Sequence, residues 1–543
     1  MTLRKTWLTS AVCATLLVTS CGGEPKPTTG LELGQTVSPA ATGTVDKIVW
    51  ALPYGEPTSL HWLKALAYSD STVLSNLCEG LTRLTPTFGT EMALASSIDR
   101  PNDSTYVIAL RDGIFFSNGA PVTPDDVVYS LSQNLDPAVG SFWAEWFKNV
   151  ASIRATGPRQ VTIAMSKPDA AFEEFLSTAG GAIVQKAYAE SRGEDYGTAR
   201  GGVMCTGPYT LDRWTPGSEI VLKANPDYWD TTHRPKVAEI DFQFITNATT
   251  IADGLRTGGI DGTFELPYES IQTLRTSGAG NVYLGKSLGY TSLEFTSKPG
   301  PTKDVRIREA LALALDRTAI ANVIFRGAAE PIKSPYFPST WGYGQDTYQQ
   351  SYDSLDVPIT ADLERAKQLV KEVGPTPELV ALSNADDPTA KQLAAYLKTQ
   401  AEQIGLTVEL TELPAAQWIA TAFDNERQKA YDITVATTNY LDVPDPIEWA
   451  EYTLRTGGTF NPGVYDNADV NGWIEQARAT ADPKARAALI GKVQEQAYGK
   501  DFAAIALANT ASVVFLNHRI SGTPVSLNAH FYYPWARDLG GTQ

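Results

Sequence analysis

One stretch, Thr105–Leu131, constrains the fold of this chain more than any other part. Bulky apolar side chains stand at every second position from Tyr106 to Leu110, which is the pattern of a β-strand. After an aromatic segment and a turn, Thr123 occupies the expected N-cap position of a helix, with Pro124 at the first helical position and two aspartates behind it. The stretch therefore predicts a strand, a turn and a capped helix in direct succession.

Strands and helices alternate in the same way along most of the chain, which favours a mixed α/β fold. A length of 543 residues exceeds what one hydrophobic core supports, so we expect two or three domains. The patterns predict helices at 72–84, 304–321, 362–373 and 389–404, and strands at 47–52, 210–214, 219–223, 240–245, 407–413, 433–437, 503–507 and 512–515.

The amino-terminal end has the composition of a secretion signal. The basic pair Arg4-Lys5 precedes the apolar run Trp7–Val18, which is too short to span a bilayer comfortably. Val18–Cys21 is similar to the lipobox of bacterial lipoproteins, which predicts a signal peptide over 1–20 and diacylation of Cys21. The alternative is an ordinary signal with an incidental cysteine. Residues 21–44, rich in Gly, Pro, Thr and Ser, predict a flexible tether outside the membrane.

The charge balance argues against a nucleic-acid partner. Formal net charge is −17, and no cluster of Lys and Arg interrupts the acidic background. Acidity of this degree mainly favours solubility and tilts the expected ligand slightly toward cationic solutes. A hydrophobic content of 43% is ample for well-packed interiors.

An enzymatic role finds little support in the motifs. Residues 285–289 satisfy the G-x-S-x-G pattern, but a nucleophile elbow needs a helix directly after Ser287, and residues 290–295 alternate like a strand. No phosphate-binding or dinucleotide-binding loop is present, and we expect no cofactor, no metal and no catalytic residue. A hydrolase that uses a pair of carboxylates stays open as an alternative. The four histidines have no metal-ligand spacing: His61, His233, His518 and His530.

Several short motifs, in order along the chain, resemble those of the bacterial extracellular solute-binding proteins of family 5, the oligopeptide, dipeptide and nickel type. Besides Thr105–Leu131, the matching segments are Glu79-Gly80-Leu81, Thr206–Tyr209, Asn225–Trp229, and Asp304-Val305-Arg306 with Asp316-Arg317. The resemblance implies a two-lobed periplasmic-binding-protein type II fold (cluster C) with an extra subdomain in the first lobe. The first lobe would comprise 45–75, 205–289 and 502–543, the extra subdomain 76–204, and the second lobe 290–501.

The resemblance also bears on the cysteines of the mature chain. Cys78 and Cys205 are either a disulfide or two buried thiols. The implied fold favours the disulfide, because it places both segments in the same lobe.

The segment Thr437–Trp449 is the candidate recognition site, since it leaves a strand at the edge of a sheet. It resembles the family segment whose acidic residue meets the α-ammonium group of a peptide, and the matching residue is Asp442. The alternative role of Asp442 is to organise its own turn. An extended peptide would pair with the backbone of this segment, opposite Tyr68 on the facing lobe. The backbone residues expected to pair are Thr438, Asn439 and Tyr440.

The resemblance implies a monomeric, lipid-anchored binding protein outside the cell membrane. It would capture a peptide and pass it to an ABC permease, with ATP hydrolysis in separate subunits. An oligosaccharide, a metal chelate or another small cationic solute is the alternative cargo, and a secreted hydrolase acting on peptides or cell wall is the alternative of another class.

Overall fold

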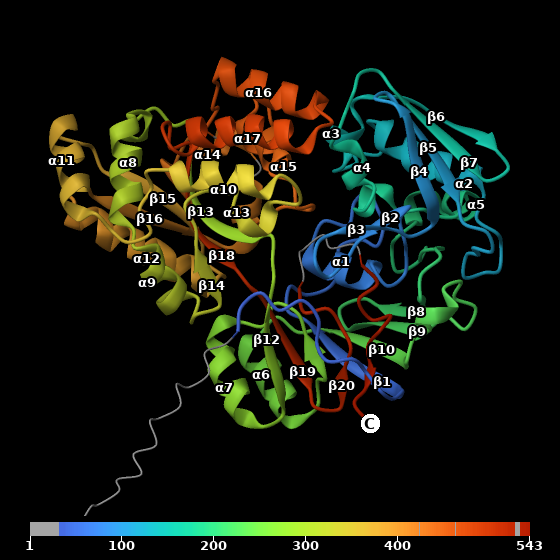
Figure 1. Ribbon diagram of the computed structural model, residues 1–543. Coiled ribbons are helices and arrows are strands. Elements are labelled where there is room, and N and C mark those ends of the chain that lie inside the picture. The colour runs from blue at the N-terminus through green and yellow to red at the C-terminus, as the bar shows by residue number, and fades with distance from the viewer. Residues whose placement is uncertain (1–31, 423, 462, 527–532) are drawn as a thin grey trace, which may run out of the picture.

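The computed structural model describes residues 32–543 except 423, 462 and 527–532 (Figure 1). The predicted signal peptide, Cys21 and the first part of the predicted tether lie outside these residues. In the described part, no helix is both long and apolar enough to cross a membrane. The chain is a mixed α/β protein built on three main sheets.

A seven-stranded sheet forms the lower part of the molecule in Figure 1, in the order β12-β19-β11-β1-β10-β9-β8. Its central strand β1 runs parallel to β10 and β11. Helices α6 (Ala248–Thr257) and α7 (Ile271–Ser277) bury Ile251 and Leu274 in a common core with residues of β12 and β19. The strands are β1 Val45–Leu52, β8 Tyr209–Thr215, β9 Glu219–Ala224, β10 Val237–Phe244, β11 Gly262–Thr263, β12 Gly280–Gly285 and β19 Ser512–Asn517.

A six-stranded sheet forms the second part, in the order β14-β18-β13-β17-β15-β16. Helices of this part, coloured yellow to red, surround it in Figure 1. The strands are β13 Gly289–Phe295, β14 Ala329–Pro331, β15 Leu379–Asn384, β16 Val408–Leu413, β17 Ile433–Tyr440 and β18 Ala504–Thr510. The main helices are α8 Val305–Ala314, α10 Gln345–Ser354, α11 Leu363–Val373, α12 Pro388–Gln403, α16 Ala468–Ala479 and α17 Pro483–Ala497.

A four-stranded antiparallel sheet lies beside both, in the order β4-β5-β7-β6. It contains the predicted strand, observed as β5 (Thr105–Leu110), and packs near the predicted helix, observed as α2 (Pro124–Ser132). Thr123 caps α2 in a capping box with Asp126, so the sequence prediction for this stretch is confirmed. The other strands are β4 Ala95–Asn102, β6 Val150–Gly157 and β7 Gln160–Met165.

The chain passes between the two large sheets at two adjacent places. The first is 286–288, between β12 and β13, and the second is Ala511, between β18 and β19. The Asn509 side chain joins them, donating to the carbonyls of Ser287 (3.3 Å) and Gly289 (2.7 Å). Because β18 pairs with β13 and β14, the return to the first sheet occurs at Ala511 and not near residue 501 as expected.

The predicted tether is too long at its carboxyl end. Gln35 pairs with Gly285, and Gly43 pairs with Gly541. Ser38 is buried, and its hydroxyl donates to the Thr523 carbonyl at 2.9 Å. Between residues 35 and 43, the chain is therefore hydrogen-bonded to the folded body and is not a free tether.

Two predicted helices differ from the structure. Residues 72–84 do not form one helix, since α1 covers Tyr68–Leu74 and β2 covers Thr82–Leu84. The helix expected over 304–321 stops at Ala314, and Asp316 caps a new short helix.

Candidate functional site

The family-like motifs converge on one buried carboxylate, Glu79. It accepts hydrogen bonds from the Thr206 hydroxyl (3.0 Å), the Tyr228 hydroxyl (2.8 Å) and the Trp229 indole (2.7 Å). Beside it, Cys78 and Cys205 form a disulfide with Cα atoms 4.8 Å apart. These motifs therefore join residues 78–79, near the start of the predicted extra subdomain, to the part built on the seven-stranded sheet, and their role is structural.

Strand β17 has no neighbouring strand along one side of Val435–Asn439 in the described structure, where the recognition segment predicted from the sequence begins. On one side, Asn439 and Tyr440 pair with Tyr290 and Gly289 of β13. On the other side, β15 pairs only with residues up to Thr434, so the rest of β17 has no strand there in the described structure. Of the predicted pairing residues, Thr438 is exposed. The Asn439 side-chain amide donates to the Ser292 hydroxyl (2.7 Å) and to the Glu294 carboxylate (2.9 Å).

Tyr68 and Tyr440 meet across the two parts of the molecule. Tyr68 is the first residue of α1, and its ring lies edge-on to that of Tyr440, with centroids 5.6 Å apart. The ring of Tyr54 stacks on the ring of Tyr68, with centroids 4.9 Å apart. The structure thus brings together two residues predicted from opposite lobes, and adds Tyr54, which the sequence analysis did not single out.

Asp442 lies just beyond β17, in a turn that Glu448 organises. The Glu448 carboxylate accepts the backbone N–H groups of Asp442 (2.8 Å) and Val443 (3.2 Å). Asp442 and Glu448 are both almost fully buried. Burial, and then the charge of Asp442, raises the pKa of Glu448 well above its ordinary value. Two carboxyl groups in one buried turn form an acidic site that a cation would stabilise.

A second acidic group, Glu265, was missed by the sequence analysis. It follows β11 and adjoins the Tyr54 and Tyr68 rings in a pocket of the first part. Burial raises the pKa of Glu265 to about 8. No motif marks this residue, because a single glutamate after a two-residue strand carries no distinctive pattern.

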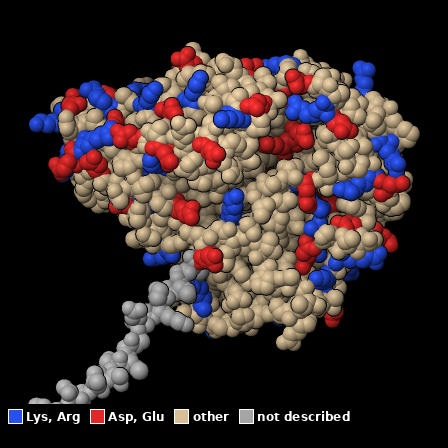
Figure 2. Space-filling model, in the orientation of Figure 1, with Lys and Arg blue, Asp and Glu red and all other residues tan. Residues whose placement is uncertain are grey.

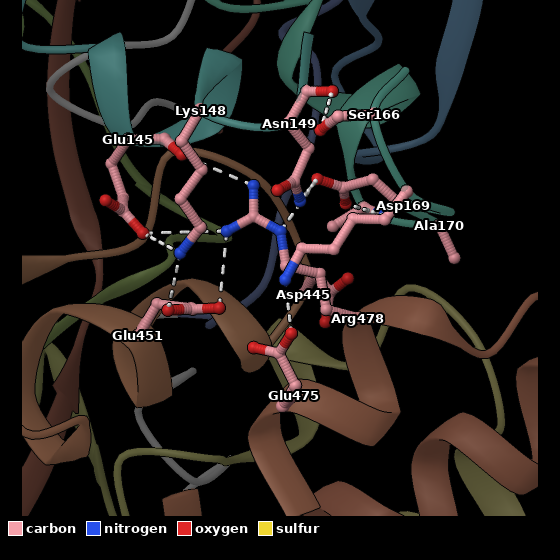
Figure 3. Close-up of polar contacts among 12 residues, drawn as sticks. Glu145, Lys148, Asn149, Ser166, Asp169, Ala170, Asp445, Glu451, Glu475 and Arg478 are labelled. Carbon is pink, nitrogen blue, oxygen red and sulfur yellow. Dashed lines mark hydrogen bonds and ion pairs between the residues drawn. The ribbon is translucent and has the colours of Figure 1, made fainter. Parts of the chain in front are cut away.

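A separate contact between the subdomain and the second part is built on Arg478 of α16 (Figure 3). Its Nε lies 2.7 Å from the Oδ2 of Asp169, and its Nη1 lies 3.2 Å from the Oε1 of Glu451. Lys148 also contacts Glu451, at 3.2 Å, and the Arg478 carbonyl accepts the N–H of Ala170 at 2.7 Å. Arg478, Asp169 and Glu451 are all buried, so the two parts are packed closely against each other here.

The outer surface carries charges of both signs. On the face shown in Figure 2, Lys and Arg side chains are interspersed with Asp and Glu. Such a mixed surface keeps an acidic protein soluble without a large field of one sign.

The surroundings of Ser287 differ from those of a nucleophile elbow. A strand, β13, follows it, and its hydroxyl accepts the backbone N–H of Gly289 at 2.7 Å. Among the described residues there is no group of three or more His, Cys, Asp or Glu side chains that could hold a metal ion.

Known proteins resemble this chain in both sequence and fold. Residues 90–461 match the model for bacterial extracellular solute-binding proteins, family 5 Middle. The glutathione-binding protein GsiB of Escherichia coli K12 is 28% identical over 436 residues, which cover 78% of this chain and 82% of GsiB.

Two solved structures show the same architecture. The oligopeptide-binding protein AppA of Bacillus subtilis, in complex with a nonapeptide, aligns with a TM-score of 0.77 at 19% identity, covering 92% of this chain and 100% of AppA. AgaA of A. tumefaciens R10, in complex with agropinic acid, aligns with a TM-score of 0.78 at 21% identity, covering 92% and 99%.

The predicted type II periplasmic-binding-protein fold is therefore confirmed. The family match spans more than half of the chain, and the matched proteins are binding proteins and not enzymes. This chain belongs to the bacterial extracellular solute-binding proteins of family 5, the solute-binding components of ABC importers.

Proposed function

We propose that this protein captures peptides outside the cell membrane and delivers them to the permease of an ABC importer. The observation that carries the proposal is the side of β17 from Val435 to Asn439 along which no neighbouring strand runs in the described structure; this part of the strand precedes Asp442. An extended peptide can add there as a strand, using main-chain hydrogen bonds that tolerate varied side chains. The similarity to AppA, whose structure contains a nonapeptide, supports a peptide as cargo.

Asp442 is the proposed partner of the peptide's α-ammonium group. A charge-assisted hydrogen bond of this kind contributes roughly 1.5–3 kcal/mol. The buried neighbour Glu448 adds a second acidic group beside Asp442, which favours a cation at this position. Tyr68 and Tyr440, whose rings lie 5.6 Å apart on the two parts, would flank the bound chain.

Release and capture would use the two crossing segments, 286–288 and Ala511, as a hinge. The solute drives closure by binding the closed state more tightly than the open one. The protein acts as a monomer, held to the membrane by two acyl chains on Cys21. Replacing Cys21 with Ser should release the protein into the medium, and retention on cells would contradict the anchor.

The test compares peptides with free and acetylated amino termini. Asp442→Ala should weaken binding of a free tetra-alanine roughly 10- to 100-fold, measured by calorimetry, and leave the acetylated form nearly unchanged. Asp469→Ala, an exposed aspartate of α16, serves as the control and should change neither. Equal losses for both peptides would remove Asp442 from the ammonium role. Native mass spectrometry of the protein from its own host identifies the cargo it retains.

A further inference from the structure

A small pocket lies in the first part of the molecule, beside the Tyr68 end of α1. Its empty space is about 220 Å³ when space open to solvent is counted, so it is a shallow recess and not an enclosed cavity. Aromatic side chains form most of its wall, and Glu265 supplies its one acidic side chain. No lysine, arginine or histidine lines it. The lining residues are Trp50, Ala51, Leu52, Pro53, Tyr54, Tyr68, Ser69, Thr72, Phe264 and Glu265.

The backbone holds Glu265 in an unusual conformation. Its φ is +54°, in the left-handed region that residues other than glycine rarely occupy. The flanking residues Phe264 and Leu266 are 2% exposed, and the Leu266 N–H donates to the Val513 carbonyl at 2.8 Å. The fold therefore tolerates local strain to keep a glutamate between two anchored apolar residues, a pattern that often marks functional positions.

Glu265 has no built-in partner. In the described part of the chain, no hydrogen bond and no ion pair reaches its carboxylate. A second acceptor group of the same pocket, the Ser69 hydroxyl, is also unpartnered there, and Ser69 is 2% exposed. Buried polar groups normally have hydrogen-bond partners, so the pocket offers acceptors to a ligand that donates hydrogen bonds.

The aromatic wall suits a positive group. Tyr54 and Tyr68 stack at 4.9 Å with an interplanar angle of 16°, and Tyr54 remains half-exposed. The faces of such rings attract ammonium and guanidinium groups. Burial, then the charge of Glu265 and also that of Asp387, raises the pKa of Tyr54. Asp387, the N-cap of α12 in the second part, therefore adds negative charge near this ring.

We propose that Glu265, Tyr54 and Tyr68 form a subsite for a cationic side chain of the captured solute, an ammonium or a guanidinium group. This proposal deepens the proposed function, since it assigns a preference for basic peptides to that cleft. The subsite is distinct from Asp442, which lies on the second part next to Glu448. Glu265 binds the charge, and the two tyrosines cover its alkyl stem.

Calorimetry with matched tetrapeptides tests the subsite. In tetra-alanine with a free amino terminus, positions 2, 3 and 4 are replaced in turn by lysine or by norleucine, which has a similar stem without the charge. At one position, the lysine peptide should bind roughly 10- to 100-fold more tightly than its norleucine partner. Glu265→Gln should remove this preference while changing the norleucine affinity less than about twofold.

Two further variants keep the outcome decisive. Glu269→Gln removes an exposed acid four residues along and should leave the lysine preference intact. Tyr54→Leu, at a half-exposed position that folding tolerates, should reduce the preference severalfold. Equal binding of lysine and norleucine peptides at every position, or a preference that survives Glu265→Gln, would overturn the subsite.

A fragment probe separates this proposal from the peptide function. Saturation-transfer NMR should detect n-butylammonium, and not n-butanol, on the wild-type protein, and the signal should vanish in Glu265→Gln. If no tetrapeptide binds, the peptide function fails, and the butylammonium result alone decides the subsite. A butylammonium signal that is absent, or unchanged in Glu265→Gln, refutes it.

Discussion

The two parts of this protein meet in two regions that handle buried charge in opposite ways. Around Arg478, the contact contains its own cation, which Asp169 and Glu451 hold between them (Figure 3). Near the contact of Tyr68 with Tyr440, Glu265 and the Asp442–Glu448 turn instead place three carboxyl groups on the two parts of the molecule.

The difference separates a structural contact from the proposed binding site. A buried ion is costly unless it is paired and hydrogen-bonded, so a contact that is always made carries both signs of charge in the chain. A site that must accept a cation from outside leaves the positive member out. Although burial opposes it, the charges of Asp169 and Glu451 hold the pKa of Arg478 above its ordinary value, whereas burial pushes the pKa of Glu265 upward.

The largest effect is expected from breaking the compensated contact. Arg478→Met leaves Asp169 and Glu451 buried without their guanidinium partner, and should lower the free energy of unfolding by about 3–5 kcal/mol. Urea denaturation of the mature protein measures it. A loss below about 1 kcal/mol would mean that Arg478 stabilises little and that the comparison above is wrong.

A smaller effect is expected at the Asp442–Glu448 turn. An ammonium group bound by Asp442 favours the ionised form of Glu448, so binding should release protons and the affinity should rise with pH. Burial and the charges of Asp442 and Glu448 raise the pKa of the Tyr440 and Tyr452 phenols, so both phenols stay protonated while Glu448 titrates. Calorimetry in buffers of different ionisation enthalpy measures the release, and Glu448→Gln should abolish it. Proton release that persists in the variant would assign it elsewhere.

Glu265 should affect the stability of the ligand-free protein more weakly. Its pKa is about 8 when folded and near 4.5 when unfolded, so the folded state keeps a proton that the unfolded state loses between these values. Stability therefore falls as the pH rises from about 4.5 to about 8. Glu265→Gln should raise Tm by about 1–2 °C near pH 9 and not near pH 4. An equal shift at both pH values would show that charge is not the cause.

The smallest effect is expected at the rim of the Arg478 contact. Lys167 pairs with Glu475 at the surface, where both side chains are nearly half-exposed. Lys167→Met should cost less than about 1 kcal/mol, because exposed ion pairs are solvated and screened. Urea denaturation beside Arg478→Met makes this the matched control, and a cost of similar size would erase the distinction between buried and exposed charge.

Local signals in the sequence predicted the elements that local chemistry controls. The capped helix after Thr123 is present as expected because its cap lies within four residues. The helix expected over 72–84 failed because Glu79 is drawn to Thr206, Tyr228 and Trp229, far away in sequence. The helix expected over 304–321 breaks where the buried Arg317 bonds distant carbonyls such as that of Ala506.

The candidate site was predictable only in part, for a similar reason. Asp442 and Tyr68 were named through a family resemblance, and the structure adds their neighbours Glu448 and Tyr54. Glu265 could not be found from sequence, because the case for it rests on the aromatic side chains that surround it in space. Such an environment exists only after distant segments have folded together.

The amino-terminal segment meets the folded body next to the first crossing between the two large sheets, residues 286–288. The Gln35 N–H donates to the Leu284 carbonyl (3.2 Å), and the Lys286 N–H donates to the Gln35 carbonyl (2.8 Å), at the start of the first crossing. Under the proposed anchoring at Cys21, a pull through this segment would act close to the crossing segments and would exert little torque on either part. The proposed opening and closing would then be mechanically independent of the anchor.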